Sequence, residues 1–170
     1  MAYMSFSNGR RISSGGNGQY RNNFVRDRQS SSDSAVPFQP LTLDNYVDLA
    51  EKVMNSMFHD DPKNPQKKKS NLSTSKIRNL LAISSEILFK ATSSQAEDQD
   101  VLSQELKTDL AYFRIRCAYE IGREKSVEDL NSNAHLLEHL KAIKTVSDCI
   151  LFCHYLEALV AYHKYFGGND

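Results

Sequence analysis

Four residues between positions 112 and 123 alternate an aromatic ring with a guanidinium group: Tyr112, Arg116, Tyr119 and Arg123. On a helix with about 100° per residue, their spacing of four, three and four places all of them on one side. Guanidinium groups pair with phosphates, and aromatic rings stack on bases without reading their sequence. We interpret this aromatic–arginine stripe as a candidate contact for a nucleic-acid strand.

The same segment offers a second explanation for its arginines. Glu120 and Glu124 lie within reach of Arg116 and Arg123, so exposed salt bridges account for the stripe about as well as nucleic acid does. An apolar face beside the stripe predicts that the helix packs on a core; it consists of Leu102, Leu106, Leu110, Phe113 and Cys117. A second row of cations (Lys107, Arg114 and Lys125) lies roughly 180° from the stripe arginines, where it can meet an acidic neighbour.

A second binding candidate is the start of the predicted helix that follows Ser73 to Ser75. A helix N-terminus offers free N–H groups and a partial positive charge, both of which favour a phosphate. Lys76 and Arg78 add full charges there, on opposite sides of the apolar Ile77. A helix capped by its own serines explains the segment equally well.

One segment resembles an enzyme motif. His135, Glu138 and His139 spell the H-x-x-E-H arrangement of inverted zinc peptidases. Both histidines are expected on the face opposite Leu130 and Leu137, so we favour two exposed histidines over a zinc site.

Three cysteines fall at apolar positions of predicted helices: Cys117, Cys149 and Cys153. We expect them to pack as small apolar residues in a reducing compartment, without disulfides or a metal. The sequence contains no glycine-rich phosphate loop and no recognisable nucleophile motif. These patterns favour a protein that is not an enzyme and needs no cofactor.

The charge balance predicts local binding. The 170 residues include 21 basic and 21 acidic side chains, so the chain has no global field. A basic cluster without intervening acids nevertheless runs from 63 to 78: Lys63, Lys67, Lys68, Lys69, Lys76 and Arg78. No apolar run approaches the ~20 residues that span a bilayer, and the N-terminus lacks the apolar core of a signal peptide. We expect a soluble, cytoplasmic protein without a membrane partner.

The chain divides into a tail and a helical domain. Residues 1–40 are rich in Ser, Gly, Asn and Arg, and this composition predicts a disordered basic tail, more simply a solvated extension than an RNA-binding arm. From residue 41 to 170 the apolar residues recur with helical spacing, and nothing alternates long enough to suggest a strand. The predicted fold is an all-α compact bundle of about five helices.

Local signals set the expected helix boundaries. Thr42 caps the first helix, which ends before a break at 59–65, and Ser73 to Ser75 start the second. The third runs from about 98 to 124. Ser126 and Asp129 form a capping box at the start of the fourth. The fifth, from 146 to 166, is apolar around most of its circumference and should cross the bundle centre, ending at Gly167 and Gly168.

Three segments together resemble one family. They are Leu72–Leu81 (LSTSKIRNLL), Leu110–Arg123 (LAYFRIRCAYEIGR) and Tyr155–Gly168 (YLEALVAYHKYFGG). They are similar to the small subunit of type III-A CRISPR effector complexes, the second protein of the Csm series. The resemblance covers roughly 44–168 in family order and does not include the first 40 residues.

The resemblance implies an all-helical, non-catalytic subunit that stacks head to tail, in several copies, along guide RNA (crRNA) and target RNA. It implies that target-RNA cleavage belongs to the backbone subunits, and DNA cleavage or second-messenger synthesis to the large subunit. Matching positions assign RNA contacts to Lys76, Arg78, Arg114, Arg116 and Arg123, to which we add Tyr119 from the stripe and Lys125, with Lys164 less secure. Little base readout is expected, because guide–target pairing carries the sequence information.

Two other functions remain compatible with the residues. A helical protein-interaction adaptor without direct RNA binding would direct its arginines at acidic partner surfaces. A metallopeptidase built on His135, Glu138 and His139 would require bound zinc.

Overall fold

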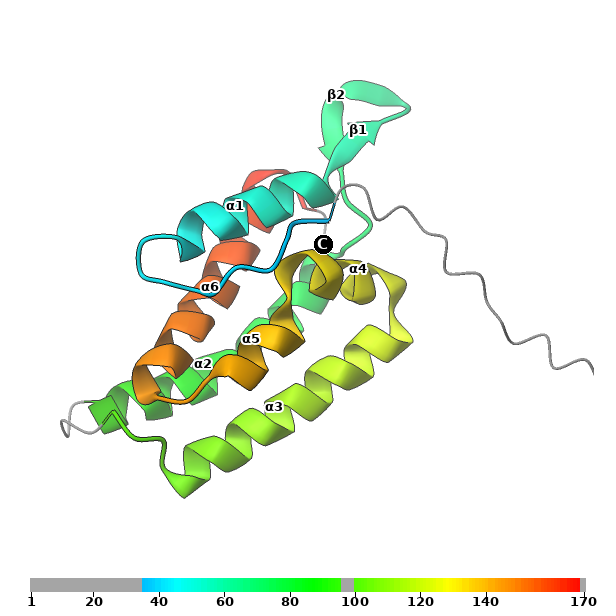
Figure 1. Cartoon of the computed structure of the whole chain (residues 1–170). Helices are drawn as coiled ribbons and strands as arrows, with labels where there is room; N and C mark the ends of the chain where they lie inside the picture. The colour runs from blue at the N-terminus through cyan, green and yellow to red at the C-terminus, as the bar shows by residue number, and fades with distance from the viewer. Residues whose placement is uncertain (1–34, 96–99, 169–170) are drawn as a thin grey trace, which may run out of the picture. The chain divides into compact units, whose positions relative to one another are not determined.

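The computed structural model describes residues 35–95 and 100–168, in which helices predominate (Figure 1). The helices are α1 (Tyr46–Met57), α2 (Thr74–Gln95), α3 (Gln104–Arg123), α4 (Lys125–Ala134), α5 (Leu136–Ala142) and α6 (Val146–Tyr165). The all-α prediction is confirmed. The predicted disordered tail covers residues 1–40, of which residues 1–34 lie outside the described residues.

Helix α6 lies at the centre, as its apolar circumference predicts. Figure 1 shows it between α1 and α2, and it packs against both. Its buried side chains include Cys149, Phe152, Cys153, Tyr155, Leu156 and Leu159. Helix α3 packs on α2, α4 and α5 and buries one apolar face, which leaves the rest of its circumference at the surface.

The predicted fourth helix is two helices. His135 ends α4 in the left-handed region, at φ 50°, and α5 begins at the next residue. The Asn131 side chain accepts the backbone N–H of Leu137 at 3.1 Å, which stabilises the turn. Because neither glycine nor proline marks this break, the helical spacing of the sequence runs through it.

Two expected caps are wrong. Helix α1 begins at Tyr46, after Asn45 whose side chain bonds the backbone of Thr42, so Thr42 belongs to the preceding turn. Helix α4 begins at Lys125, before Ser126, and its cap residue makes no side-chain cap bond. The capping box of this domain lies instead at Thr145, whose side chain accepts the Asp148 N–H while the Asp148 carboxylate accepts the Thr145 N–H.

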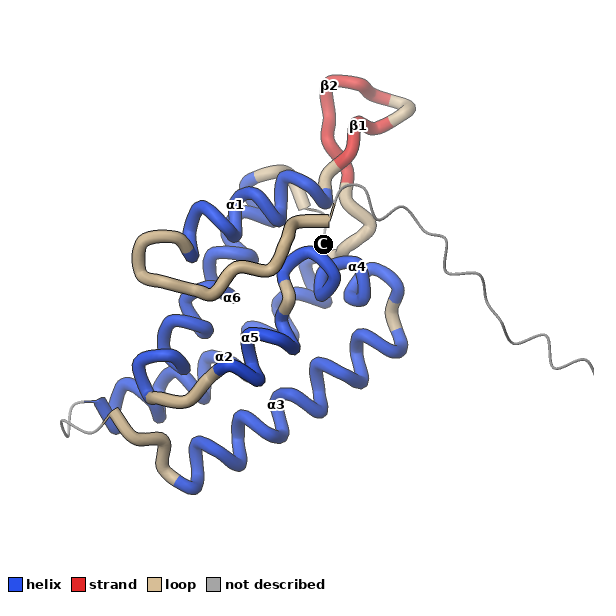
Figure 2. Tube along the Cα trace, viewed as in Figure 1, coloured by secondary structure: helices blue, strands red, loops and turns tan. Residues whose placement is uncertain are grey.

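A short β-hairpin occupies the predicted break between the first two helices (Figure 2). Strand β1 (His59–Asp61) pairs antiparallel with β2 (Asn64–Lys69), with His59 opposite Lys69 and Asp60 opposite Lys68. The strands are polar and brief, so period-two alternation could not reveal them. The expectation of no strand is therefore wrong at this one place in the described chain.

Residues 35–40 have no regular secondary structure but contact the helical domain. Val36 is buried, and its carbonyl oxygen accepts a hydrogen bond from His135 Nε2 at 2.7 Å. Phe38 contacts the rings of His135 and His139, with centroids at 5.6 and 5.0 Å. The boundary between tail and domain at residue 40 stays a prediction.

The predicted packing of the cysteines among apolar residues is confirmed, because Cys117, Cys149 and Cys153 are buried. Burial raises the pKa of Cys117 to about 12. No helix of the described segments is both long and apolar enough to cross a lipid bilayer.

The C-terminal stop is also confirmed. Gly167 has φ 94°, a conformation that favours glycine, and its N–H bonds the Lys164 carbonyl oxygen at 3.1 Å. Gly168 lies directly against the buried imidazole of His163, which in turn donates to the Leu72 carbonyl oxygen at 2.8 Å.

The substitution Gly168→Ala should therefore lower the free energy of unfolding. The added Cβ would overlap the His163 ring and lie 2.7 Å from its carbonyl oxygen, and forced overpacking costs roughly 1–3 kcal/mol. Gly122→Ala is the matched control, because a Cβ there meets nothing within 4 Å, and alanine in a helix is worth about 1 kcal/mol over glycine. Urea unfolding should show a lower free energy of unfolding for Gly168→Ala and a higher one for Gly122→Ala. Equal changes in the two variants would contradict the close contact between Gly168 and His163.

Candidate nucleic-acid interface

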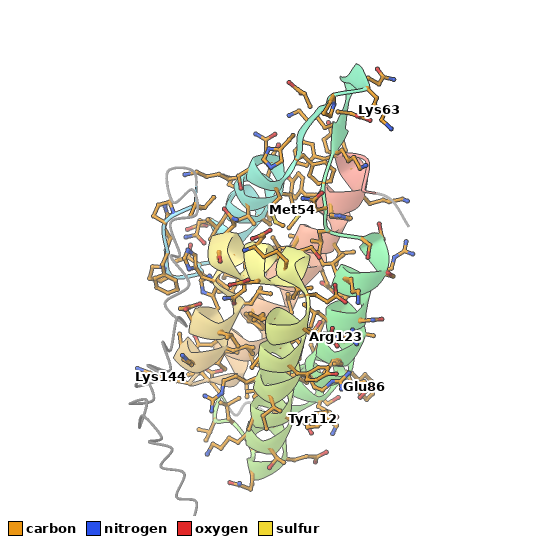
Figure 3. All side chains as sticks on the ribbon, turned by 90° about the vertical axis from the view of Figure 1, so that its right-hand side faces the viewer. Met54, Lys63, Glu86, Tyr112, Arg123 and Lys144 are labelled. Atoms are coloured by element: carbon orange, nitrogen blue, oxygen red, sulfur yellow. The ribbon has the colours of Figure 1, made fainter. Side chains whose placement is uncertain are left out.

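The aromatic–arginine stripe lies exposed on α3. Its tyrosines point to solvent, with Tyr112 58% and Tyr119 56% exposed. Figure 3 shows Tyr112 and Arg123 on the outward side of this helix. The apolar residues beneath the stripe (Leu106, Leu110, Phe113 and Cys117) are buried, so α3 packs without using the stripe.

The two arginines of the stripe differ in their surroundings. Arg123 Nη2 contacts the carboxylates of Glu120 at 3.1 Å and Glu124 at 3.9 Å, and its guanidinium lies 5.5 Å from the Tyr119 ring centroid. Glu120 is the chief cause of a raised pKa for Arg123. Arg116, by contrast, takes part in no ion pair with any residue in 35–95 or 100–168. Salt bridges within the chain therefore explain Arg123 but not Arg116.

The start of α2 lies next to the end of α3. Lys76 Nζ contacts Glu124 Oε1 at 2.9 Å, and this hydrogen bond is the main reason that the pKa of Glu124 is lowered. Arg78 is exposed two residues further along α2, which turns it roughly 160° away from Lys76. Because Glu124 contacts both Lys76 and Arg123, the structure brings Lys76 into the neighbourhood of Arg123, which their distance in sequence did not establish.

Arg114 and Lys125 lie apart from the stripe. Lys125 is exposed at the start of α4 and contacts Asp129 at 2.7 Å and Glu128 at 3.3 Å, with Asp129 the chief cause of its raised pKa. Arg114 lines a groove of about 190 Å³ between α3 and α5, together with Lys107 and Lys141. Sequence reasoning missed Lys141, because its orientation depends on where α5 begins.

The basic hairpin extends the charge beyond α2. Lys68 Nζ donates to Asn55 Oδ1 at 3.0 Å and lies 5.8 Å from the Phe166 ring centroid, which ties β2 to α1 and to the end of α6. Lys63 and Lys69 are exposed. The basic cluster predicted from the sequence therefore runs from the hairpin to the first turn of α2.

The histidines of the peptidase-like motif are not arranged as expected. His139 is only 4% exposed and packs against the rings of Phe38 and Tyr155, so the expectation of two exposed histidines is wrong. The break at His135 reorients α5 relative to α4, and this turns His139 into the core. Among the described residues, no group of three His, Cys, Asp or Glu side chains is placed to hold a metal ion.

Burial of His139 predicts a pH dependence of stability. Desolvation, with a smaller effect of His135, lowers its pKa from 6.5 to about 4. The unfolded chain therefore binds this proton more tightly, so stability should fall as pH drops from 6.5 toward 4, by at most about 3 kcal/mol. Urea unfolding across this pH window should show that the free energy of unfolding depends less steeply on pH in His139→Met than in the wild type. The control His59→Gln changes an exposed residue and should keep the wild-type slope; an unchanged slope in His139→Met would contradict the prediction.

Comparison with known proteins identifies the family. The family model described as Csm2 Type III-A matches residues 51–169. A relative from Streptococcus thermophilus, named CRISPR system Cms protein Csm2, is 38% identical over 130 residues, which are 76% of this chain and 98% of the relative. The chain belongs to the Csm2 family of type III-A CRISPR systems.

Other Csm2 proteins agree. A Mycobacterium tuberculosis relative of the same name is 36% identical over 129 residues (75% of this chain, 95% of the relative), and one from Enterococcus italicus is 33% identical over 102 residues (58% and 71%). Csm2 proteins are subunits of the type III-A Csm complex, which implies other Csm subunits as partners. The family resemblance seen in the sequence is confirmed, and the Csm2 match includes every residue predicted to contact RNA.

Proposed function

We propose that this chain is a non-catalytic, RNA-binding subunit of the Csm complex that binds RNA along the face shared by α2 and α3. Several copies stack head to tail along guide RNA and target RNA in the cytoplasm, in contact with the large and backbone subunits, and contribute to antiviral defence. The observation that carries this proposal is Arg116, which has no carboxylate partner among the described residues and stands between two exposed tyrosines.

Phosphate neutralisation is the expected mechanism. Arg116 and Arg123 are seven residues apart on α3, which is about 10 Å along a helix, or roughly three times the 3.4 Å rise of a stacked strand. Lys76 extends the basic surface at the end where Arg123 lies, and Arg78 is exposed on the same helix as Lys76. Because the chain as a whole carries no net charge, binding depends on this local surface.

A binding role also fits the chemistry of the exposed groups. Guanidinium groups stay protonated at neutral pH and cannot act as general bases. The stripe combines them with phenol rings that stack on any base, which suits an RNA whose sequence is already read by pairing.

A protein-interaction adaptor without direct RNA contact is the second candidate. The groove that carries Lys107, Arg114 and Lys141 favours it, because its cations also lack carboxylate partners in the described chain and can receive an acidic protein surface. Purified protein that retains no RNA at low salt, yet enters a Csm complex, would support the adaptor.

The double variant Arg116→Ala with Arg123→Ala should weaken RNA binding equally for unrelated sequences. Losing two phosphate contacts should also reduce the slope of log affinity against log salt concentration by about 1.4 for a single-stranded RNA. Fluorescence anisotropy with two labelled RNAs of different sequence, over a salt series, measures both quantities.

Lys52→Ala with Lys144→Ala is the matched control. It removes the same charge from exposed positions away from the stripe, and Figure 3 shows Lys144 on the edge opposite Arg123. A loss as large in this control, or a loss that depends on base sequence, would refute the proposed mechanism. Affinity purification of wild type from its host should also retrieve guide RNA with the large Csm subunits.

A further inference from the structure

The groove between α3 and α5 combines apolar walls with positive charge. Its walls include Leu102, Leu110, Ala111, Leu140 and Ile143, and its cations are Lys107, Arg114 and Lys141. None of these three cations forms an ion pair with a residue in 35–95 or 100–168. A surface with apolar walls and unpartnered cations suits a ligand that is both apolar and acidic.

The exposed side of α1 has the complementary character. Asp44, Asp48 and Glu51 are exposed there and form no ion pair within the described segments; we call them the acidic ridge. Glu51 also lies near Tyr162 and contributes, after burial, to the raised pKa of that hydroxyl. Beside the ridge, Leu43 is 79% and Val47 38% exposed, so apolar side chains accompany the acids.

The two surfaces are complementary in charge and in apolar character. Asp44 lies in the turn before α1, and Asp48 and Glu51 follow about one turn apart on that helix. Lys107 and Arg114 lie two turns apart on α3, which is about 10 Å along the helix. The exposed apolar side chains beside the ridge can contact the apolar walls of the groove. We propose that the acidic ridge of one copy docks into the α3–α5 groove of the next copy.

This inference rests on the proposed head-to-tail stacking and names its two surfaces. Figure 1 shows α1 and α3 on opposite sides of α5 and α6, so one copy cannot bring its own ridge to its own groove. The contact is heterologous: each pair leaves one ridge and one groove free, and assembly continues as an open stack. The aromatic–arginine stripe lies roughly 180° around α3 from Arg114, so it stays accessible to RNA.

The contact should be electrostatic and individually weak. Exposed charges are screened by salt, so association should rise with protein concentration and fall with ionic strength. RNA that holds copies side by side raises their effective concentration and should strengthen the stack.

Charge reversal on full-length protein tests the pairing. The ridge variant is Asp48→Lys with Glu51→Lys, and the groove variant is Lys107→Glu with Lys141→Glu; Arg114 is left unchanged so that each variant reverses two charges. Sedimentation velocity should show association of wild type that weakens in high salt, and monomers for either variant alone. A mixture of the two variants should associate again, because each reversed surface then meets an opposite charge. Glu86→Lys with Asp60→Lys alters two exposed acids elsewhere and should associate like wild type.

Site-directed cross-linking tests the geometry. Val47→Cys beside the ridge and Ala111→Cys in the groove should be joined by a short bismaleimide only when the two variants are mixed. Either variant alone should give no cross-linked dimer, since the native cysteines are buried. Ala82→Cys, exposed on α2, serves as the control and should not cross-link to Val47→Cys.

Several results would overturn the inference: a wild-type chain that stays monomeric both alone and on RNA, reversals that leave association unchanged, or dimers formed by Val47→Cys alone. A groove variant that loses RNA binding and keeps association would show that RNA occupies the groove.

Arg116→Ala with Arg123→Ala separates this inference from the proposed function, because it should reduce RNA binding and leave protein association intact. Restored association in the charge-swapped mixture without any RNA binding would support the interface and reject the RNA role.

Discussion

The rest of the structure depends on covering α6. This helix is apolar around most of its circumference, and its exposure on any side would cost about 25 cal/mol per Å² of apolar surface. Helices α1 and α2 pack along it, residues of α3, α4 and α5 also contact it, and its Phe152 and Leu156 are each 1% exposed. Helix α3 then takes a peripheral position with one buried face. A peripheral helix can carry two differently charged surfaces, and α3 does so with Arg116 on one side and Arg114 on the other.

Ion pairs at both ends position α3 on α2. Lys76 contacts Glu124 where α3 ends, and Lys90 contacts Glu105 at 2.6 Å and Asp109 at 2.8 Å where α3 begins. Hydrogen bonds to these two carboxylates raise the pKa of Lys90. Each exposed pair adds little stability, but these three pairs, made by two lysines about four turns apart on α2, fix the register of two antiparallel helices. The stripe owes its position beside α2 to this register.

The sequence predicted the elements whose signals are long and periodic. The apolar face of α3, the central position of α6 and the three buried cysteines follow from side-chain spacing alone. The exposed state of the stripe followed as well, because Tyr112 and Tyr119 lie outside the apolar arc. What spacing could not supply was the break at His135, where tertiary contacts with Val36 and a side-chain bond from Asn131 hold a left-handed residue. That one break explains three errors of the prediction: the single fourth helix, the exposed His139 and the missed groove residue Lys141. The β-hairpin was missed for a different reason, since its strands are short and polar in sequence.

Formal neutrality conceals a strong separation of charge. Helix α1, which carries the acidic ridge, and helix α3, which carries the cationic surfaces, lie on opposite sides of α5 and α6 (Figure 1), in a chain whose formal charge is zero. A uniformly basic subunit would bind RNA but repel its own copies, whereas a neutral one with separated charge can attract both. The proposed protein contact and the proposed RNA contact also use different sides of α3, because a copy docked against Arg114 leaves Arg116 and Arg123 facing away from it. In a stack built this way each copy keeps its stripe uncovered, and a phosphate backbone is the polyanion that these stripes can bind.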